Sequence, residues 1–154
     1  MRVEEIRVNP DFSEFDTGIA ILKLTEPLVF SKNIQAVALT QQTAAVGTVV
    51  DISGWGRLTD NSEDMHRTLQ VNDATVVETA QCERYLGRSD SQVICLESAR
   101  RNGICRGDFG GPAVHNGELV GIAAYLMGEC GSLLPDVFVN VAYHYDWIVN
   151  QMKQ

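Results

Sequence analysis

The most informative stretch of the sequence reads Gly103-Ile104-Cys105-Arg106-Gly107-Asp108-Phe109-Gly110-Gly111-Pro112. Its glycines let the backbone turn tightly and present N–H groups outward. At the centre of the turn stands Phe109, which has no lone pair and no ionisable proton and so cannot act as a nucleophile. The stretch therefore predicts a tight, glycine-rich turn with an unreactive side chain at its centre.

The length and composition of the chain are those of one soluble globular domain. It has 154 residues, of which 45% are hydrophobic and 21% charged, enough for a real core. Its net charge of −8 argues against a nucleic-acid partner and, more weakly, against an anionic membrane surface. We expect no membrane span, because no apolar run approaches ~18 residues, and no signal peptide, because residues 1–6 lack an apolar core.

The four cysteines, at positions 82, 95, 105 and 130, allow three pairings. An even number favours disulfides in an oxidising compartment, although four reduced thiols would also be compatible with a cytosolic domain. No Cys-x-x-Cys pair and no His/Cys cluster with zinc spacing occurs in the sequence. We therefore expect neither a metal site nor a cofactor.

Short and alternating apolar runs separated by turn residues predict a mostly β protein. The predicted strands are residues 19–24, 36–39, 48–53, 68–77, 113–114, 119–124 and 137–141. Asn116-Gly117 predicts a type I′ hairpin turn between two of them, and residues 59–67 form a polar loop. Helical spacing is confined to residues 143–153, with a shorter helical turn near residues 80–85. The pattern predicts an antiparallel barrel or sandwich with a terminal helix.

The glycine-rich stretch resembles the nucleophile loop of the trypsin/chymotrypsin family of serine proteases (peptidase S1), whose signature is Gly-Asp-Ser-Gly-Gly-Pro. Further features similar to that family follow in its order along the chain: residues 3–12, residues 18–24, Gly54-Trp55-Gly56, the spacing of the cysteines, residues 135–139 and Asp146-Trp147-Ile148. The resemblance implies disulfides Cys82–Cys95 and Cys105–Cys130. It also implies an all-β fold with a trypsin-like antiparallel β-barrel and a C-terminal α-helix.

The resemblance divides the chain into unequal parts. Residues 1–45 correspond to a remnant of the family's first barrel, residues 46–142 to the complete second barrel and residues 143–154 to the terminal helix. The apolar residues of the remnant are not expected to be covered completely by their own layer; they are Ile6, Phe12, Phe15, Ile19, Ile21 and Phe30.

The positions that match the family's catalytic triad are degenerate. Phe109 stands where the family has its serine, and Gly18 stands where it has its aspartate. Asp16 lies two residues earlier, about 7 Å away along a strand. The resemblance places the catalytic histidine upstream of Met1. We expect the histidines of this chain, His66, His115 and His144, to be structural.

The specificity pocket of the family is also altered. Gly103 occupies the position of the pocket-floor residue, and Asp136 replaces a glycine on the opposite side. Leu126 replaces another glycine in the pocket wall. Asp136 is therefore either the carboxylate of a vestigial specificity pocket or a carboxylate satisfied by local N–H groups.

The resemblance also identifies a vestigial oxyanion loop, formed by Gly107, Asp108 and Phe109. In the family this aspartate pairs with the amino terminus that activation cleavage creates. The sequence offers no matching terminus, so we expect a zymogen-like loop.

The resulting hypothesis is a catalytically inactive serine protease homologue, secreted like its family, that binds or regulates other components of extracellular proteolysis. Its protein partner would be a protease, an inhibitor or the missing N-terminal segment. Three alternatives remain open at this stage. Family membership alone favours a serine-type endopeptidase, Arg106-Gly107-Asp108 matches an integrin-type adhesion motif, and a truncated fragment would have no function.

Overall fold

The computed structural model describes residues 1–10, 18–86, 91–99 and 102–153. Its elements, in chain order, are β1 (Val3–Val8), β2 (Ala20–Leu24), β3 (Ala38–Leu39), β4 (Val49–Gly54), β5 (Gln70–Val77), α1 (Thr79–Leu86), β6 (Val93–Ser98), β7 (Pro112–His115), β8 (Glu118–Tyr125), β9 (Asp136–Asn140) and α2 (Tyr145–Met152). No helix among the described residues is long and apolar enough to cross a membrane.

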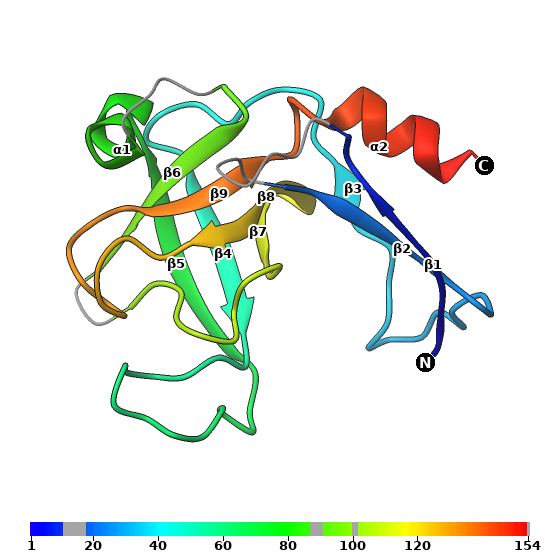
Figure 1. The fold of residues 1–154 in the computed structure, drawn as a ribbon, viewed down its shortest axis with the longest axis horizontal. Coiled ribbons are helices and arrows are strands. Elements are labelled where there is room, and N and C mark those ends of the chain that lie inside the picture. Colours follow the sequence, from blue (N-terminus) through cyan, green and yellow to red (C-terminus); the bar gives the residue numbers. More distant parts are fainter. Residues whose placement is uncertain (11–17, 87–90, 100–101, 154) are drawn as a thin grey trace.

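Strands β4 to β9 form a closed antiparallel barrel (Figure 1). Around the described barrel each strand pairs with the next in the order β7, β4, β5, β6, β9, β8, and the pairing of β7 with β8 completes the ring. Because the barrel is closed, each of these strands has a pairing partner on both sides over at least part of its length. The interior is filled by alternate side chains, among them Val50, Ile52, Leu96 and Phe138.

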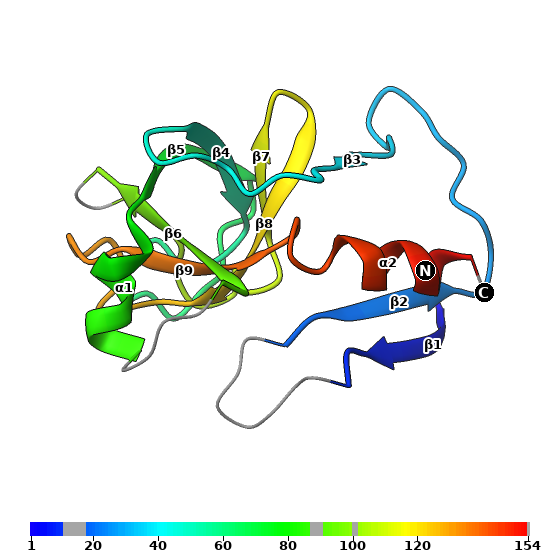
Figure 2. The same ribbon diagram turned by 90° about the horizontal axis from the view of Figure 1, so that it is seen from above.

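The N-terminal strands form a separate two-stranded sheet beside the barrel. A second apolar cluster joins the two parts: Ile19 and Ile21 from this region pack with Val139 and Ile148. Arg7 strengthens the connection, because its guanidinium donates a 2.6 Å hydrogen bond to the carbonyl of Gln151 near the end of α2. Figure 2 shows α2 lying beside β2, so the terminal helix covers one face of the small sheet.

The prediction of a mostly β fold with an antiparallel barrel and a terminal helix is confirmed. Asn116 and Gly117 have φ angles of 49° and 79°, as a type I′ turn requires. The predicted strand 36–39 shrinks to two residues, which pair in parallel with β8. Sequence analysis missed β6, whose four consecutive buried residues, Val93 to Leu96, give no alternating pattern.

Both cysteine pairings implied by the resemblance are present. Cys82 is bonded to Cys95, with Cα atoms 6.2 Å apart, and Cys105 to Cys130, with Cα atoms 5.0 Å apart. The first disulfide anchors α1 to the outer wall of the barrel, where Cys82 and Cys95 pack with Val93 and Val137.

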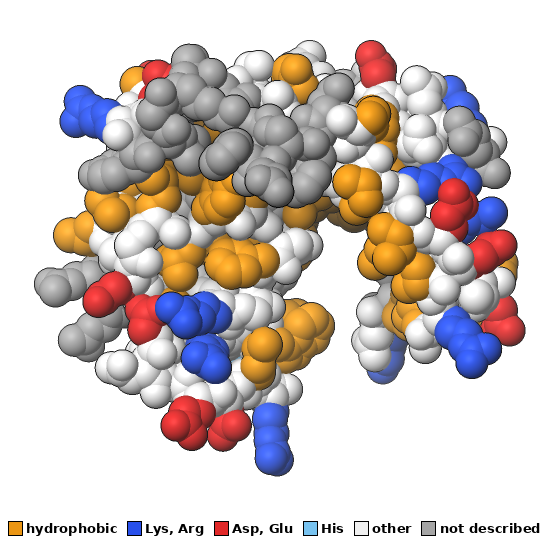
Figure 3. Space-filling model, viewed as in Figure 1, with side chains coloured by type: hydrophobic (Ala, Val, Ile, Leu, Met, Phe, Trp, Pro, Cys, Tyr) orange, Lys and Arg blue, Asp and Glu red, His pale blue; other side chains and the backbone are white. Residues whose placement is uncertain are grey.

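Apolar side chains of the N-terminal part are unevenly covered, as expected. Ile19 is 6% exposed, whereas Ile6 is 63% and Phe30 is 61% exposed. Phe12 and Phe15 lie outside the described residues. Ile6 pairs with Leu22 across β1 and β2, and both project from the face of the small sheet that the described residues leave uncovered. Figure 3 shows apolar side chains along the N-terminal part of the chain, beside a hollow that separates this part from the barrel.

We predict that backbone amides of β2 exchange with solvent faster than those of β8. Strand β2 pairs only with β1 among the described residues, whereas β8 pairs with β3, β7 and β9. Local opening therefore breaks fewer contacts in β2. Hydrogen exchange of a monomeric sample measures both strands at once, and equal protection would show that the small sheet is as stable as the barrel.

Candidate functional site

Asp108 links two turns at one end of the barrel. One carboxylate oxygen accepts a 2.7 Å hydrogen bond from the N–H of Gly56, and the other accepts a 2.9 Å bond from the N–H of Cys105. A Cβ atom at Gly54 or Gly56 would collide with this carboxylate. The Gly-Trp-Gly turn therefore approaches Asp108 only because its two glycines have no side chains.

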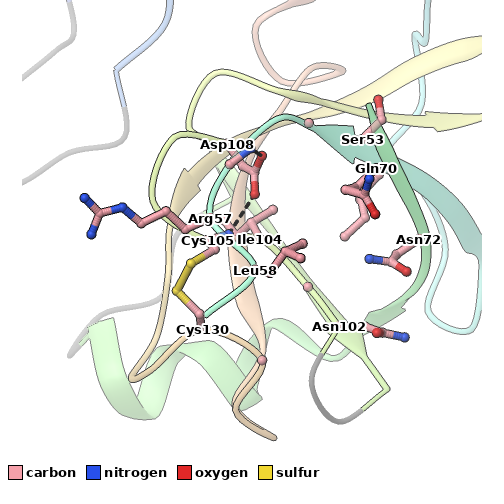
Figure 4. A pocket seen from close by; sticks show the side chains of 15 residues that line it. Ser53, Arg57, Leu58, Gln70, Asn72, Asn102, Ile104, Cys105, Asp108 and Cys130 are labelled. Atoms are coloured by element: carbon pink, nitrogen blue, oxygen red, sulfur yellow. Dashed lines mark hydrogen bonds between the residues drawn. A yellow bond between two sulfur atoms is a disulfide. The ribbon is translucent and has the colours of Figure 1, made fainter. Parts of the chain in front are cut away.

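A cavity of about 60 Å³ lies beside Asp108. Its wall includes the carboxamides of Gln70, Asn72 and Asn102 together with apolar groups such as Ile104 (Figure 4). Arg57, which also borders the cavity, extends away from it. The cavity thus combines one carboxylate, which has already accepted two N–H groups, with a mostly uncharged polar wall.

The turn around Phe109 is tightly hydrogen-bonded. The N–H of Asp108 donates to the carbonyl of Cys105, that of Gly110 to Ala123, and that of Gly111 to Asp108. Gly107 and Gly110 have φ angles of 100° and 83°, which side chains rarely allow. Phe109 itself is 51% exposed. The turn therefore presents the ring at the surface.

Met65 is a neighbour of this turn that sequence analysis did not identify. A Cβ atom built on Gly107 would overlap the sulfur of Met65, so the thioether lies directly against this glycine. Met65 belongs to the polar loop of residues 59–67, and nothing in the local sequence connects it with Gly107. An exposed methionine therefore contacts the glycine-rich turn that carries the exposed Phe109.

Gly103 and Asp136 are in contact, because a Cβ atom on Gly103 would lie 2.7 Å from a carboxylate oxygen of Asp136. Gly103 lines the cavity described above. Asp136 is 7% exposed, and one carboxylate oxygen accepts a 3.0 Å hydrogen bond from the N–H of Ile104. Burial raises the pKa of Asp136 to about 6, the Ile104 N–H opposes this rise, and the negative charge of Asp108 adds to it. Leu126 follows the end of β8 and is half-buried.

Comparison with known proteins identifies the family. The family model described as Trypsin matches residues 1–148. The chain belongs to the trypsin family.

Individual relatives and a solved structure agree with this assignment. The chain is 37% identical to the Serine protease SP24D of Anopheles gambiae over 93% of this chain and 52% of the relative. It is 31% identical to the Brachyurin of Leptuca pugilator (96% of this chain, 66% of the relative) and 35% identical to the Anionic trypsin of Canis lupus familiaris (91% and 58%). The structure of neuropsin, a serine protease of mouse brain, superimposes with a TM-score of 0.90 at 27% identity, covering 97% of this chain and 70% of that one.

The chain thus spans about half to two thirds of the length of these curated trypsin-family relatives. Gly18, which the sequence analysis predicted to match the family's aspartate, is exposed and directly precedes the buried Ile19. Asp16 lies outside the described residues.

The three histidines of this trypsin-family chain bond to the framework around them. His66 bonds through Nδ1 to the carbonyl of Thr68 at 2.8 Å, and His115 through Nδ1 to the carbonyl of Val49 at 2.7 Å. His144 is buried before α2 and contacts the side chain of Asn9. Each histidine thus contacts other residues of the fold, and the structural role expected for them stays a prediction.

The geometry of Arg106-Gly107-Asp108 does not favour adhesion. Arg106 is exposed and lies 3.8 Å from Asp60. The Asp108 carboxylate instead points inward and accepts hydrogen bonds from two backbone N–H groups. It is therefore not presented to a metal ion on another protein. In the described part of the chain, no group of three His, Cys, Asp or Glu side chains could hold a metal ion either.

We predict that Asp108→Ala lowers the free energy of unfolding by about 2–4 kcal/mol, because the N–H groups of Gly56 and Cys105 lose a charged acceptor. Urea denaturation followed by tryptophan fluorescence measures the change. Asp64→Ala, in the exposed 59–67 loop, is the matched control, and we expect it to stay within about 0.5 kcal/mol of the native chain. Equal stability of all three proteins would mean that Asp108 does not hold the turns together.

Proposed function

We propose that this chain is a non-catalytic member of the trypsin family that acts by binding another protein. The observation that carries the proposal is Phe109, which stands at the centre of the glycine-rich turn where the sequence resemblance expects the family's serine. Its ring cannot donate an electron pair to a carbonyl carbon, so no acyl intermediate can form there. Gly18, in the position expected for the aspartate, supports the same proposal, because a glycine has no carboxylate to orient a base.

The surface around Phe109 has the composition of a protein-binding site. Phe109 and Met65 are 51% and 57% exposed, and the nearby Arg106 is also exposed. Aromatic residues, methionine and arginine are enriched where proteins meet. This supports a partner that contacts the former substrate face, such as a protease or an inhibitor.

The uncovered face of the β1–β2 sheet supports a second contact with protein. Val3, Ile6, Val8 and Leu22 are each between 45% and 63% exposed there. A contiguous apolar face of this kind is usually covered by polypeptide. The segment that would complete the first barrel is the partner we propose for it.

We propose a secreted, extracellular location. Two disulfides and membership of the trypsin family support it, because disulfides persist in oxidising compartments. Serine endopeptidase activity is the second candidate function, favoured by the family match alone.

A fluorophosphonate probe, whose phosphorus is attacked by an activated serine with loss of fluoride, distinguishes these two functions. We predict that the native chain is not labelled. Phe109→Ser should be labelled at a rate at least about a thousandfold below that of dog anionic trypsin, or not at all, because a serine without a base and an orienting carboxylate is a poor nucleophile. Phe109→Ala is the matched control for non-specific labelling.

One result would contradict the proposal, and another would contradict the prediction for the variant. Labelling of the native chain would reveal an activated nucleophile elsewhere in the molecule. Labelling of Phe109→Ser at a rate comparable to trypsin, with Phe109→Ala unlabelled, would show that the remaining parts of the triad are present and functional.

A further inference from the structure

Two Asn-Gly pairs occur in the chain, Asn102-Gly103 and Asn116-Gly117. In such a pair the backbone nitrogen of the glycine can attack the side-chain amide carbon of the asparagine and close a five-membered ring. Glycine offers the least steric hindrance to this approach. The reaction is intramolecular, so its rate depends on whether the local backbone lets the two atoms meet. The fold therefore decides which of the two pairs reacts.

The Asn116-Gly117 pair is held away from this reaction. It forms the turn between β7 and β8, with φ angles of 49° and 79°, and the strands pair at His115 and Glu118 on either side of it. The carboxamide is also occupied, because Nδ2 of Asn116 lies 3.0 Å from Nε2 of His115. Bringing the glycine nitrogen onto the side-chain carbon requires rotation about the Cα–C bond of Asn116, and that rotation would break the hairpin turn.

The Asn102-Gly103 pair has the opposite properties. Asn102 is exposed, and its carboxamide forms no hydrogen bond with the described residues. Figure 4 shows this carboxamide at the margin of the cavity. The N–H of Asn102 donates a 2.9 Å bond to the carbonyl of Ala99, but the N–H of Gly103 donates to none of the described residues, and the pair lies outside every strand. No strand pairing therefore opposes rotation about the bond that brings the two reacting atoms together.

We propose that Asn102 is a site of spontaneous covalent modification, at which the folded protein converts the asparagine to isoaspartate and aspartate. The Gly103 nitrogen loses its proton and bonds to Cγ of Asn102, while the C–N bond of the side-chain amide breaks and ammonia leaves. Water then opens the cyclic imide at either of its two carbonyl groups, which gives isoaspartate or aspartate. Water is the co-reactant, and nothing is oxidised or reduced. The proposal does not depend on what the chain binds.

The modification would alter the segment that leads into Phe109. Isoaspartate carries the main chain through its Cβ atom, so the chain before Gly103 becomes one atom longer. Gly103 has no space for a shift toward Asp136, because a Cβ atom on it would lie 2.7 Å from that carboxylate. The next N–H, of Ile104, donates a 3.0 Å hydrogen bond to the same carboxylate. A longer chain at this close contact should therefore displace the N–H of Ile104 from its acceptor.

The charge of the products acts in the same direction. Isoaspartate and aspartate each place a new carboxylate at the wall of the cavity that Asp108 also lines. Asp136 holds the adjoining N–H of Ile104 from the barrel side. A third negative charge on this short segment adds repulsion between groups that are largely shielded from water. We therefore expect the modified chain to hold Ile104 less firmly than the native chain.

Peptide mapping by mass spectrometry, during incubation at neutral pH, tests the site. The reduced chain unfolded in urea gives the intrinsic rates of both pairs. We expect folding to change the rate at Asn102 by less than about threefold and to slow Asn116 by about tenfold or more, because the hairpin must open before the ring can close. Asn102→Gln, which would have to close a less favourable six-membered ring, should stay unmodified at that position. Asn116→Gln is the matched control and should keep the modification of Asn102.

Hydrogen exchange of the incubated samples tests the effect on the loop. The amide of Ile104 should lose protection in proportion to the modified fraction in the native chain and in Asn116→Gln, whereas incubated Asn102→Gln should keep the protection of a fresh sample. Equal slowing of both pairs by folding would overturn the proposal, and so would modification of Asn116 as fast as Asn102 in the folded chain. Unchanged protection of Ile104 in fully modified protein would overturn the effect on the loop.

Discussion

Closure of the six-stranded barrel is the constraint on which the rest of the structure depends. Because neighbouring strands are antiparallel, the end of one and the start of the next meet at the same rim. At one rim β4 ends at Gly54 and β6 ends at Ser98, while β7 begins at Pro112 and β9 begins at Asp136. The glycine-rich turn, the Gly-Trp-Gly turn and the buried carboxyl come together there because the barrel closes.

This arrangement explains why the residues on either side of Phe109 in the sequence are tied to the fold itself. Asp108 holds the N–H groups of Gly56 and Cys105, and Gly54 and Gly56 leave room for its carboxylate. Each of these residues has a role in folding that does not require catalysis. Phe109 has no comparable role, because its side chain lies half in solvent and fills no part of the described core. The motif is therefore weak evidence for activity, and its central residue is the informative one.

The sequence alone was enough to predict a structural feature wherever its signal is local or its residue spacing is fixed. The Asn116-Gly117 hairpin, the terminal helix and the cysteine pairs are all specified by residues close together or by family spacing. The sequence alone did not predict contacts between segments that lie far apart along the chain. Met65 against Gly107, and the N–H of Cys130 on the carboxylate of Asp60 at 2.8 Å, depend on how a polar loop folds back over the rim. No periodicity or composition records such a contact.

The two parts of the chain differ in how completely their strands are paired and their sheet faces covered. Each barrel strand has two neighbours, and its inward side chains share one core. The small sheet buries only the face that carries Ile21 and Arg7, against α2 and the barrel wall, while Ile6 and Leu22 remain uncovered on the other. An apolar sheet face is stabilised when another layer covers it. Among the described residues the barrel therefore covers its own core, whereas the small sheet keeps one apolar face exposed.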